Sequence, residues 1–132
     1  MKRLLPHIYL ENCKDALDYY QQVFGGEIIN TQLADGIEGF NGHEGKYIHA
    51  ELHINSSCII YFADVFRPLT NGTNIWLMLD LETEEEINKI YQELTRAGQV
   101  KMELQDTFWN SRYGVVTDKY GVTWELNLSK DQ

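Results

Sequence analysis

The sequence has few of the features that define a disulfide scaffold, a cysteine metal site or a membrane protein. It contains 2 cysteines and 2 prolines in 132 residues. Cys13 and Cys58 lie far apart and form no CxxC pair, so we expect two free thiols. No apolar run approaches the roughly 20 residues of a membrane-spanning helix, and the first residues turn polar too early for a signal peptide. These absences predict a cytoplasmic protein.

Positive charge is also scarce. The chain has 11 Lys and Arg against 20 Asp and Glu, which gives a net charge of −9. Such a charge repels phosphate backbones and anionic lipid surfaces, so neither nucleic acid nor a membrane is an expected partner. The hydrophobic content of 43% suits a folded protein with one core. We expect a single domain over 1–132, with module one at 1–64, a linker at 65–73 and module two at 74–132.

The first half of the chain alternates between strand and helix patterns. Residues 4–10 alternate in polarity, which predicts a strand, and Asn12 is placed to cap a following helix. That helix has an apolar stripe at helical spacing and ends at Gly25. Three more strands are predicted, at Glu27–Leu33, Tyr47–Ile54 and Cys58–Ala63. The connection 34–45 has a glycine at every third position, which we interpret as a flexible flap.

The second half repeats this order. Thr83 and Glu86 form a capping box for a helix that is predicted to stop at Gly98. Its predicted buried stripe is Ile87, Ile90, Leu94 and Ala97. Four strands are predicted, at Asn74–Leu81, Val100–Gln105, Arg112–Thr117 and Val122–Leu128, with a turn at 118–121 before the last. The order strand-helix-strand-strand-strand therefore occurs twice, which predicts an α+β fold of two βαβββ modules.

Each predicted sheet has one face without a helix to cover it. A helix buries its apolar stripe against one sheet face, so the residues on the opposite face are free to line something else. We expect the two uncovered faces to converge on a shared cup with an apolar wall and a few polar groups. Its predicted lining is His7, Tyr9, Tyr47, His49, Glu51, Trp76, Met78, Thr123, Glu125 and Asn127, and Trp109 and Tyr113 add aromatic wall for a planar ligand.

Three segments resemble a known family. They are residues 12–27 (NCKDALDYYQQVFGGE), 48–54 (IHAELHI) and 113–127 (YGVVTDKYGVTWELN). They are similar to the hallmark segments of the PhnB-like branch of the vicinal oxygen chelate superfamily, which comprises glyoxalases, bleomycin-resistance proteins and dioxygenases. The resemblance implies a cup-shaped, mixed eight-stranded sheet and a cytosolic homodimer that binds a small molecule. It leaves open whether modules pair within one chain or between chains.

The resemblance also implies candidate metal ligands. In the superfamily's enzymes, His or Glu side chains from the first and last strands of each module hold a divalent metal. The first-strand position falls on Leu5, with His7 two residues on, and the closing position of module one falls on Glu51. In module two the positions fall on Trp76, which cannot ligate, and on Glu125. The implied ligands are His7, Glu51 and Glu125, with His49 as a further donor.

Two functions are compatible with these residues. The first is a small-molecule-binding protein whose ligand contacts the cup residues Tyr9, Tyr47, His49, Trp76, Met78, Trp109 and Tyr113. The alternative is a metal-dependent lyase, isomerase or dioxygenase, with the metal on His7, Glu51 and Glu125, and with Glu125 as the catalytic residue that moves a proton. Inward carboxylates also suit a cationic or polyhydroxylated ligand without a metal, and a purely structural dimer would fill the cup with side chains.

Overall fold

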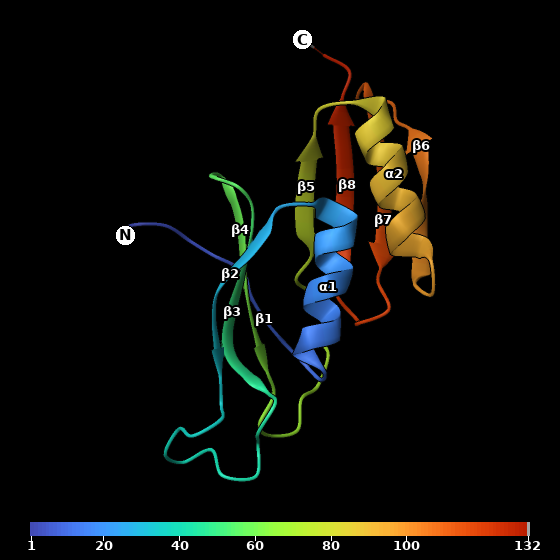
Figure 1. Cartoon of the computed structure of the whole chain (residues 1–132). Coiled ribbons are helices and arrows are strands. Elements are labelled where there is room, and N and C mark those ends of the chain that lie inside the picture. The colour runs from blue at the N-terminus through green and yellow to red at the C-terminus, as the bar shows by residue number, and fades with distance from the viewer. Residues whose placement is uncertain (132) are drawn as a thin grey trace. The chain divides into compact units, whose positions relative to one another are not determined.

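The computed structural model describes residues 1–131, and its contacts divide the chain into two units, Met1–Leu69 and a second that begins at Thr70. Each unit is a four-stranded mixed sheet with one helix, so the predicted α+β class and the two βαβββ modules are confirmed (Figure 1). The first unit has strand order β1-β4-β3-β2 and the second β5-β8-β7-β6. The elements are β1 (His7–Leu10), α1 (Cys13–Phe24), β2 (Glu27–Leu33), β3 (Tyr47–Asn55), β4 (Cys58–Asp64), β5 (Leu77–Leu81), α2 (Glu84–Thr95), β6 (Gln99–Asp106), β7 (Ser111–Thr117) and β8 (Thr123–Ser129).

The core of the first unit lies between α1 and its sheet. The helix buries Ala16, Leu17, Tyr20 and Val23, which recur at helical spacing. The Tyr20 ring stacks on Phe62 of β4 with centroids 5.4 Å apart. On β3, Ala50 and Leu52 are fully buried, so the even-numbered residues of this strand face the helix. The odd-numbered residues therefore lie on the opposite face.

The start of α1 is capped by a distant carboxylate. Asn12 has a left-handed backbone (φ 56°) and makes no side-chain cap hydrogen bond, so the prediction that Asn12 caps this helix is wrong. Its side chain donates to Asp15 instead, at 2.5 Å. Asp64, at the end of β4, accepts from the Cys13 amide at 2.9 Å and from the Tyr47 amide at 2.6 Å. One buried carboxylate thus joins the helix N-terminus to two strands.

The connection 34–46, which we predicted to be a flexible flap, is a regular ribbon of turns. Four backbone amides, those of Ile37, Phe40, His43 and Lys46, each donate at 3.1 Å to the carbonyl three residues earlier. The third residue of every turn is a glycine with positive φ, which a type II turn requires. The Phe40 and His43 rings pack edge-on against Phe66, each with centroids 5.1 Å apart. The three-residue glycine spacing is the signature of these repeated turns.

Replacing Gly42 with Ala tests this ribbon. Gly42 has φ 89° and nothing within 4 Å of an added Cβ, so the substitution strains the backbone without a steric clash. The left-handed conformation costs an L-residue about 1–2 kcal/mol. We expect the His43 amide to exchange with solvent about 5- to 30-fold faster by NMR. Asn41→Ala, one residue earlier and without positive φ, is the control, and equal exchange rates in both variants would contradict the turn assignment.

The core of the second unit lies between α2 and its sheet. Ile87, Ile90 and Leu94 of α2 are buried, as are Trp124 and Leu126 of β8. Thr83 accepts from the Glu86 amide at 3.1 Å, which confirms it as the helix cap, and the Glu86 carboxylate reaches the Glu82 amide at 3.0 Å. Buried Asp118 accepts from the Trp124 indole at 2.8 Å and so ties the predicted turn 118–121 to the core.

Several predicted boundaries change in the structure. The first strand begins at His7 rather than Leu4, and β5 begins at Leu77 rather than Asn74. The second helix ends at Thr95, so Ala97 is exposed with φ 59° instead of belonging to the buried stripe. The shortened strands leave Ile75 and Trp76 outside β5. Neither helix of residues 1–131 has the length and hydropathy of a membrane span.

Candidate functional site

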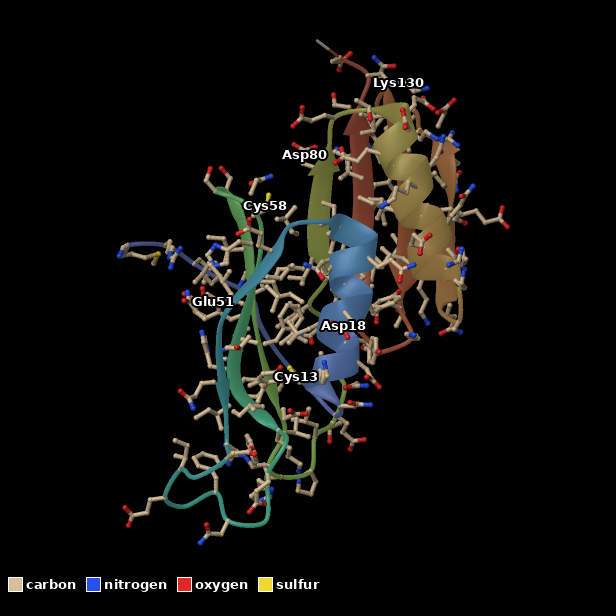
Figure 2. The ribbon with its side chains drawn as sticks, viewed as in Figure 1. Cys13, Asp18, Glu51, Cys58, Asp80 and Lys130 are labelled. Atoms are coloured by element: carbon tan, nitrogen blue, oxygen red, sulfur yellow. The ribbon has the colours of Figure 1, made fainter. Side chains whose placement is uncertain are left out.

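The helix-free face of the first sheet carries a row of residues in register across all four strands. His7 of β1 pairs with Tyr61 of β4, Tyr61 with Glu51 of β3, and Glu51 with Ile29 of β2. Residues in register across adjacent strands lie on the same face. Figure 2 shows Glu51 on the side of β3 that points away from α1. The sheet therefore brings the two predicted ligands His7 and Glu51 to one face, with Tyr61 between them.

Glu51 is the centre of a hydrogen-bonded cluster on this face. It is only 6% exposed, although it lies on the face without a helix. One carboxylate oxygen accepts from His49 Nε2 at 2.7 Å, and the other accepts from His53 Nε2 at 2.7 Å and from Asn30 Nδ2 at 3.0 Å. We define His49, Glu51, His53 and Asn30 as the Glu51 cluster. Both oxygens of its carboxylate thus accept hydrogen bonds.

These contacts keep Glu51 ionised. Burial alone would raise the pKa of the Glu51 carboxyl, but the hydrogen bonds from His49, His53 and Asn30 outweigh it and lower the pKa to about 2. An ionised carboxylate only accepts hydrogen bonds, so the Nε2 atom of each histidine carries the proton. When the ring is neutral, its Nδ1 is then the unprotonated acceptor.

Aromatic rings extend the Glu51 cluster toward the edge strand β1. The His7 ring stacks on Tyr9 with centroids 4.5 Å apart, and it meets the edge of His49 at 6.1 Å. The His49 ring also packs edge-on against Tyr61 at 4.8 Å. Burial first, and then the neighbouring His49, lower the pKa of His7 below its usual value. These contacts therefore favour the neutral form of the His7 imidazole.

A cavity of about 480 Å³ lies at the Tyr9 end of this face. This size is within the range of small-molecule sites. Asp64 lines the cavity, but both of its oxygens accept from backbone amides, so the Asp64 carboxylate acts as part of the wall. The cavity is lined by Tyr9, Asp64, Val65, Phe66, Arg67 and Leu69. Its walls combine aromatic and aliphatic groups with one guanidinium.

Three members of this arrangement were not among the predicted site residues: Asn30, His53 and Tyr61. Asn30 reaches Glu51 because β2 has a register shift after Ile29 and Asn30 itself has φ 54°. Asparagine tolerates this left-handed conformation, so an asparagine inside a β-branched strand was the available signal. Tyr47 was predicted to bind through its side chain, but the contact that the structure gives it is through its amide, which donates to Asp64.

The second unit has its own polar pair on its helix-free face. The Tyr113 hydroxyl of β7 donates to Glu125 of β8. Burial, then the hydrogen bond and the charge of Glu125, raise the pKa of Tyr113 to about 12, so the phenol keeps its proton. The Trp109 ring lies 5.7 Å from Tyr113, and Met78 pairs with Glu125 in register. Four predicted site residues, Met78, Trp109, Tyr113 and Glu125, therefore lie near one another.

Trp76 has a hydrogen bond of its own outside the strands. It precedes β5, is 47% exposed, and its indole nitrogen donates to the Thr73 carbonyl at 2.9 Å. The indole thus has a fixed orientation, with its only hydrogen-bond donor already used. What it offers to a ligand is the face of its ring.

The fold and these sites define a two-module α+β protein with helix-free sheet faces that carry polar clusters. A sequence model of the Glyoxalase/Bleomycin resistance protein/Dioxygenase superfamily matches residues 4–126, and the chain belongs to this superfamily. The chain is 30% identical to the protein YjdN from Escherichia coli over 142 aligned positions, which cover 98% of this chain and 97% of YjdN. The resemblance to the family is thereby confirmed over nearly the whole chain.

Solved structures show the same fold. Protein PA1353 from Pseudomonas aeruginosa has a TM-score of 0.87 at 26% identity, covering 99% of this chain and 100% of that one. The PhnB protein from Bacillus cereus has a TM-score of 0.82 at 29% identity, covering 97% and 100%. The fosfomycin resistance protein FosX from Listeria monocytogenes, solved with Mn(II), shares the fold at 13% identity with a TM-score of 0.67, covering 98% and 92%. A protein with this fold thus binds a metal.

Within each unit, the predicted ligands Glu51 and Glu125 already take part in hydrogen bonds. Both oxygens of Glu51 accept from histidine or asparagine, and one oxygen of Glu125 accepts from Tyr113. Glu51 lies on β3, so its assignment to the last strand of module one is wrong, because that strand is β4. Tyr61 of β4 lies between His7 and Glu51, which places these two residues about 10 Å apart across two strand spacings. Among residues 1–131, no group of three His, Cys, Asp or Glu side chains is placed to hold a metal. A metal at Glu51 would therefore compete with the hydrogen bonds from His49, His53 and Asn30.

Proposed function

We propose that this chain is a PhnB-like small-molecule-binding protein that holds its ligand against the helix-free face of the first sheet. The observation that supports this proposal is the cavity of about 480 Å³ beside Tyr9. The His7–Tyr9 stack connects this cavity with the Glu51 cluster. A ligand can therefore contact apolar walls at one end and imidazole groups at the other.

The chemistry of the face favours a ligand with hydroxyl groups on an apolar or planar body. The Glu51 carboxylate takes the Nε2 protons of His49 and His53, which leaves their Nδ1 atoms as acceptors when the rings are neutral. Hydroxyl groups can donate to such acceptors. Tyr9 and Phe66 at the cavity supply the aromatic surface for the rest of the molecule.

Thermal-shift and calorimetric titrations test this function. The probes are bleomycin, catechol and S-lactoylglutathione, one for each activity in the superfamily's name, followed by a library of hydroxylated metabolites. We expect at least one compound to raise the melting temperature in proportion to its concentration. Tyr9→Ala is expected to weaken its binding about tenfold or more, because Tyr9 forms both the cavity wall and the stack with His7.

Tyr91→Ala is the matched control, since it removes the same side chain from α2. Equal losses in Tyr9→Ala and Tyr91→Ala would place the ligand elsewhere and contradict the proposed site. A melting temperature that no probe or metabolite changes would contradict the function itself.

The alternative is a metal-dependent lyase, isomerase or dioxygenase that uses His7, Glu51 and Glu125. The neutral imidazole of His7 favours it, because a metal ligand must be deprotonated. Elemental analysis of protein purified without chelator, and calorimetric titration with zinc, nickel, manganese and iron, test it. A stoichiometric metal that is lost in Glu125→Gln supports this alternative, and a protein that refuses all four metals rules it out.

The family resemblance supports a homodimer in the cytoplasm as part of the same proposal. Light scattering on the purified chain tests the dimer, and a monomer at micromolar concentration would contradict it. The single domain over 1–132 and the linker 65–73 stay predictions.

A further inference from the structure

The second unit has a pocket of about 390 Å³ that the proposed function does not use. It lies at the end of the helix-free face, where the turn between β7 and β8 meets the segment that precedes β5. Asn71 packs directly on that turn, because a Cβ at Gly121 would come within 2.5 Å of its Nδ2 atom. The lining includes Asn71, Trp76, Lys101, Thr117, Gly121 and Thr123.

The charge of this pocket is opposite to that of the whole chain. Among residues 1–131, Lys101 is the only charged residue that lines this pocket, whereas the protein has a net charge of −9. No carboxylate within residues 1–131 forms a salt bridge with Lys101. An ammonium group without an anionic partner, beside a partly enclosed space, attracts an anion.

The remaining polar groups also favour an acceptor-rich ligand. The hydroxyl oxygens of Thr117 and Thr123 lie 2.7 Å apart, and one donates to the other. That bond uses one of their two hydroxyl hydrogens, which leaves the second free to donate. The pocket thus presents an ammonium and a hydroxyl donor, the pair of groups that a carboxylate accepts from.

The apolar wall is a single indole ring. Trp76 is held by its hydrogen bond to the Thr73 carbonyl at 2.9 Å, and it is 47% exposed. A fixed, half-exposed indole face is suited to stacking with a planar ring. We propose that this pocket is a second binding site, specific for a small aromatic carboxylate that stacks on Trp76 and places its carboxylate at Lys101 and the threonine pair.

Three probes of similar size separate the two parts of this recognition. Benzoate is planar and anionic, benzamide is planar and neutral, and cyclohexanecarboxylate is anionic but not planar. We expect benzoate to bind more tightly than both others in NMR titrations, with the largest shifts at the Trp76 indole and the Lys101 amide. Added salt should weaken the binding of the two anions and leave the affinity for benzamide unchanged.

Two variants assign the contacts. Lys101→Gln is expected to weaken the binding of benzoate about five- to tenfold and to leave the affinity for benzamide unchanged, because it removes only the ion pair. Trp76→Leu is expected to abolish the preference for benzoate over cyclohexanecarboxylate. Lys89→Gln, an exposed lysine on α2, removes the same charge from the same unit and should not alter binding.

Equal affinity for benzoate and benzamide would overturn the proposal, as would unchanged benzoate binding in Lys101→Gln. Shifts confined to residues outside the pocket would overturn it as well. Lys101 is exposed on a strand, so its substitution leaves the core intact and the test does not depend on Trp76→Leu folding. This site is in the second unit, so its failure and that of the Tyr9 site are separate results.

Discussion

Glu51→Gln is expected to lower the free energy of unfolding by about 1–3 kcal/mol at pH 7. The carboxylate is 6% exposed and accepts from His49, His53 and Asn30. A glutamine has one acceptor oxygen, and its amide nitrogen is a donor. At least one of the three donors on this face therefore loses its partner, or a histidine has to change tautomer to accept from the new amide. Urea unfolding of the variant and the wild type measures the difference.

The loss of stability caused by Glu51→Gln should depend on pH in a way that a packing defect would not produce. The pKa of Glu51 is lowered from 4.5 to about 2 in the folded protein. A group with a lowered folded pKa contributes stability above its unfolded pKa and loses it as the pH falls through its folded pKa. The difference between wild type and Glu51→Gln should therefore be constant above pH 5 and shrink between pH 5 and 2.

Glu103→Gln is the control for this experiment, because Glu103 is an exposed strand carboxylate in the second unit. It should change the free energy of unfolding by less than about 0.5 kcal/mol. A Glu51→Gln difference that stays the same from pH 7 to pH 2.5 would contradict an ionised, hydrogen-bonded Glu51.

The order of the elements could be predicted because it rests on local patterns. Period-two alternation in Tyr47–Ile54 and the helical stripe of α1 both depend on which side of one element is buried. The structure accordingly places His49, Glu51 and His53 on one face of β3, as the alternation requires. The type of each element was therefore determined by residues within it.

The contacts that complete the site could not be predicted in this way. Asp64 caps α1 from 51 residues along the chain, and no spacing rule connects it with Cys13. Asn30 joins the Glu51 cluster through a register shift in β2, which alternation alone does not reveal. Such contacts depend on how strands meet, and this is set by tertiary packing.

The three-residue spacing of the glycines was noted in the sequence, but the repeated turn that it indicates was missed. Gly36, Gly39, Gly42 and Gly45 were interpreted as a source of flexibility. The structure uses their positive φ angles to repeat one turn four times. Glycine permits conformations that other residues avoid, and its spacing indicated a regular structure with one such conformation per turn.

Asp64→Asn is expected to have the largest effect on the stability of the first unit, about 2–4 kcal/mol. Its carboxylate is 4% exposed and accepts from the Cys13 amide with one oxygen and from the Tyr47 amide with the other. Asparagine has the same shape as aspartate, but its side-chain NH₂ group takes the place of one carboxylate oxygen. One of the two backbone amides then faces a donor instead of an acceptor. The substitution therefore removes a hydrogen bond without leaving a cavity.

The two amides report this loss separately from global unfolding. Hydrogen exchange at Cys13 and Tyr47 should accelerate more in Asp64→Asn than exchange at buried amides of β8 in the second unit. Asp15→Asn is the matched control, since Asp15 is an exposed carboxylate in the first turn of the same helix. Asp15→Asn should lower the free energy of unfolding by about 0.3–1 kcal/mol, because it removes a negative charge that interacts favourably with the helix dipole. Equal losses of stability in the two variants would mean that the Asp64 contacts contribute no more to stability than a surface charge does. The hydrogen bonds of Asp64 would then not stabilise the cavity wall that it forms beside Tyr9.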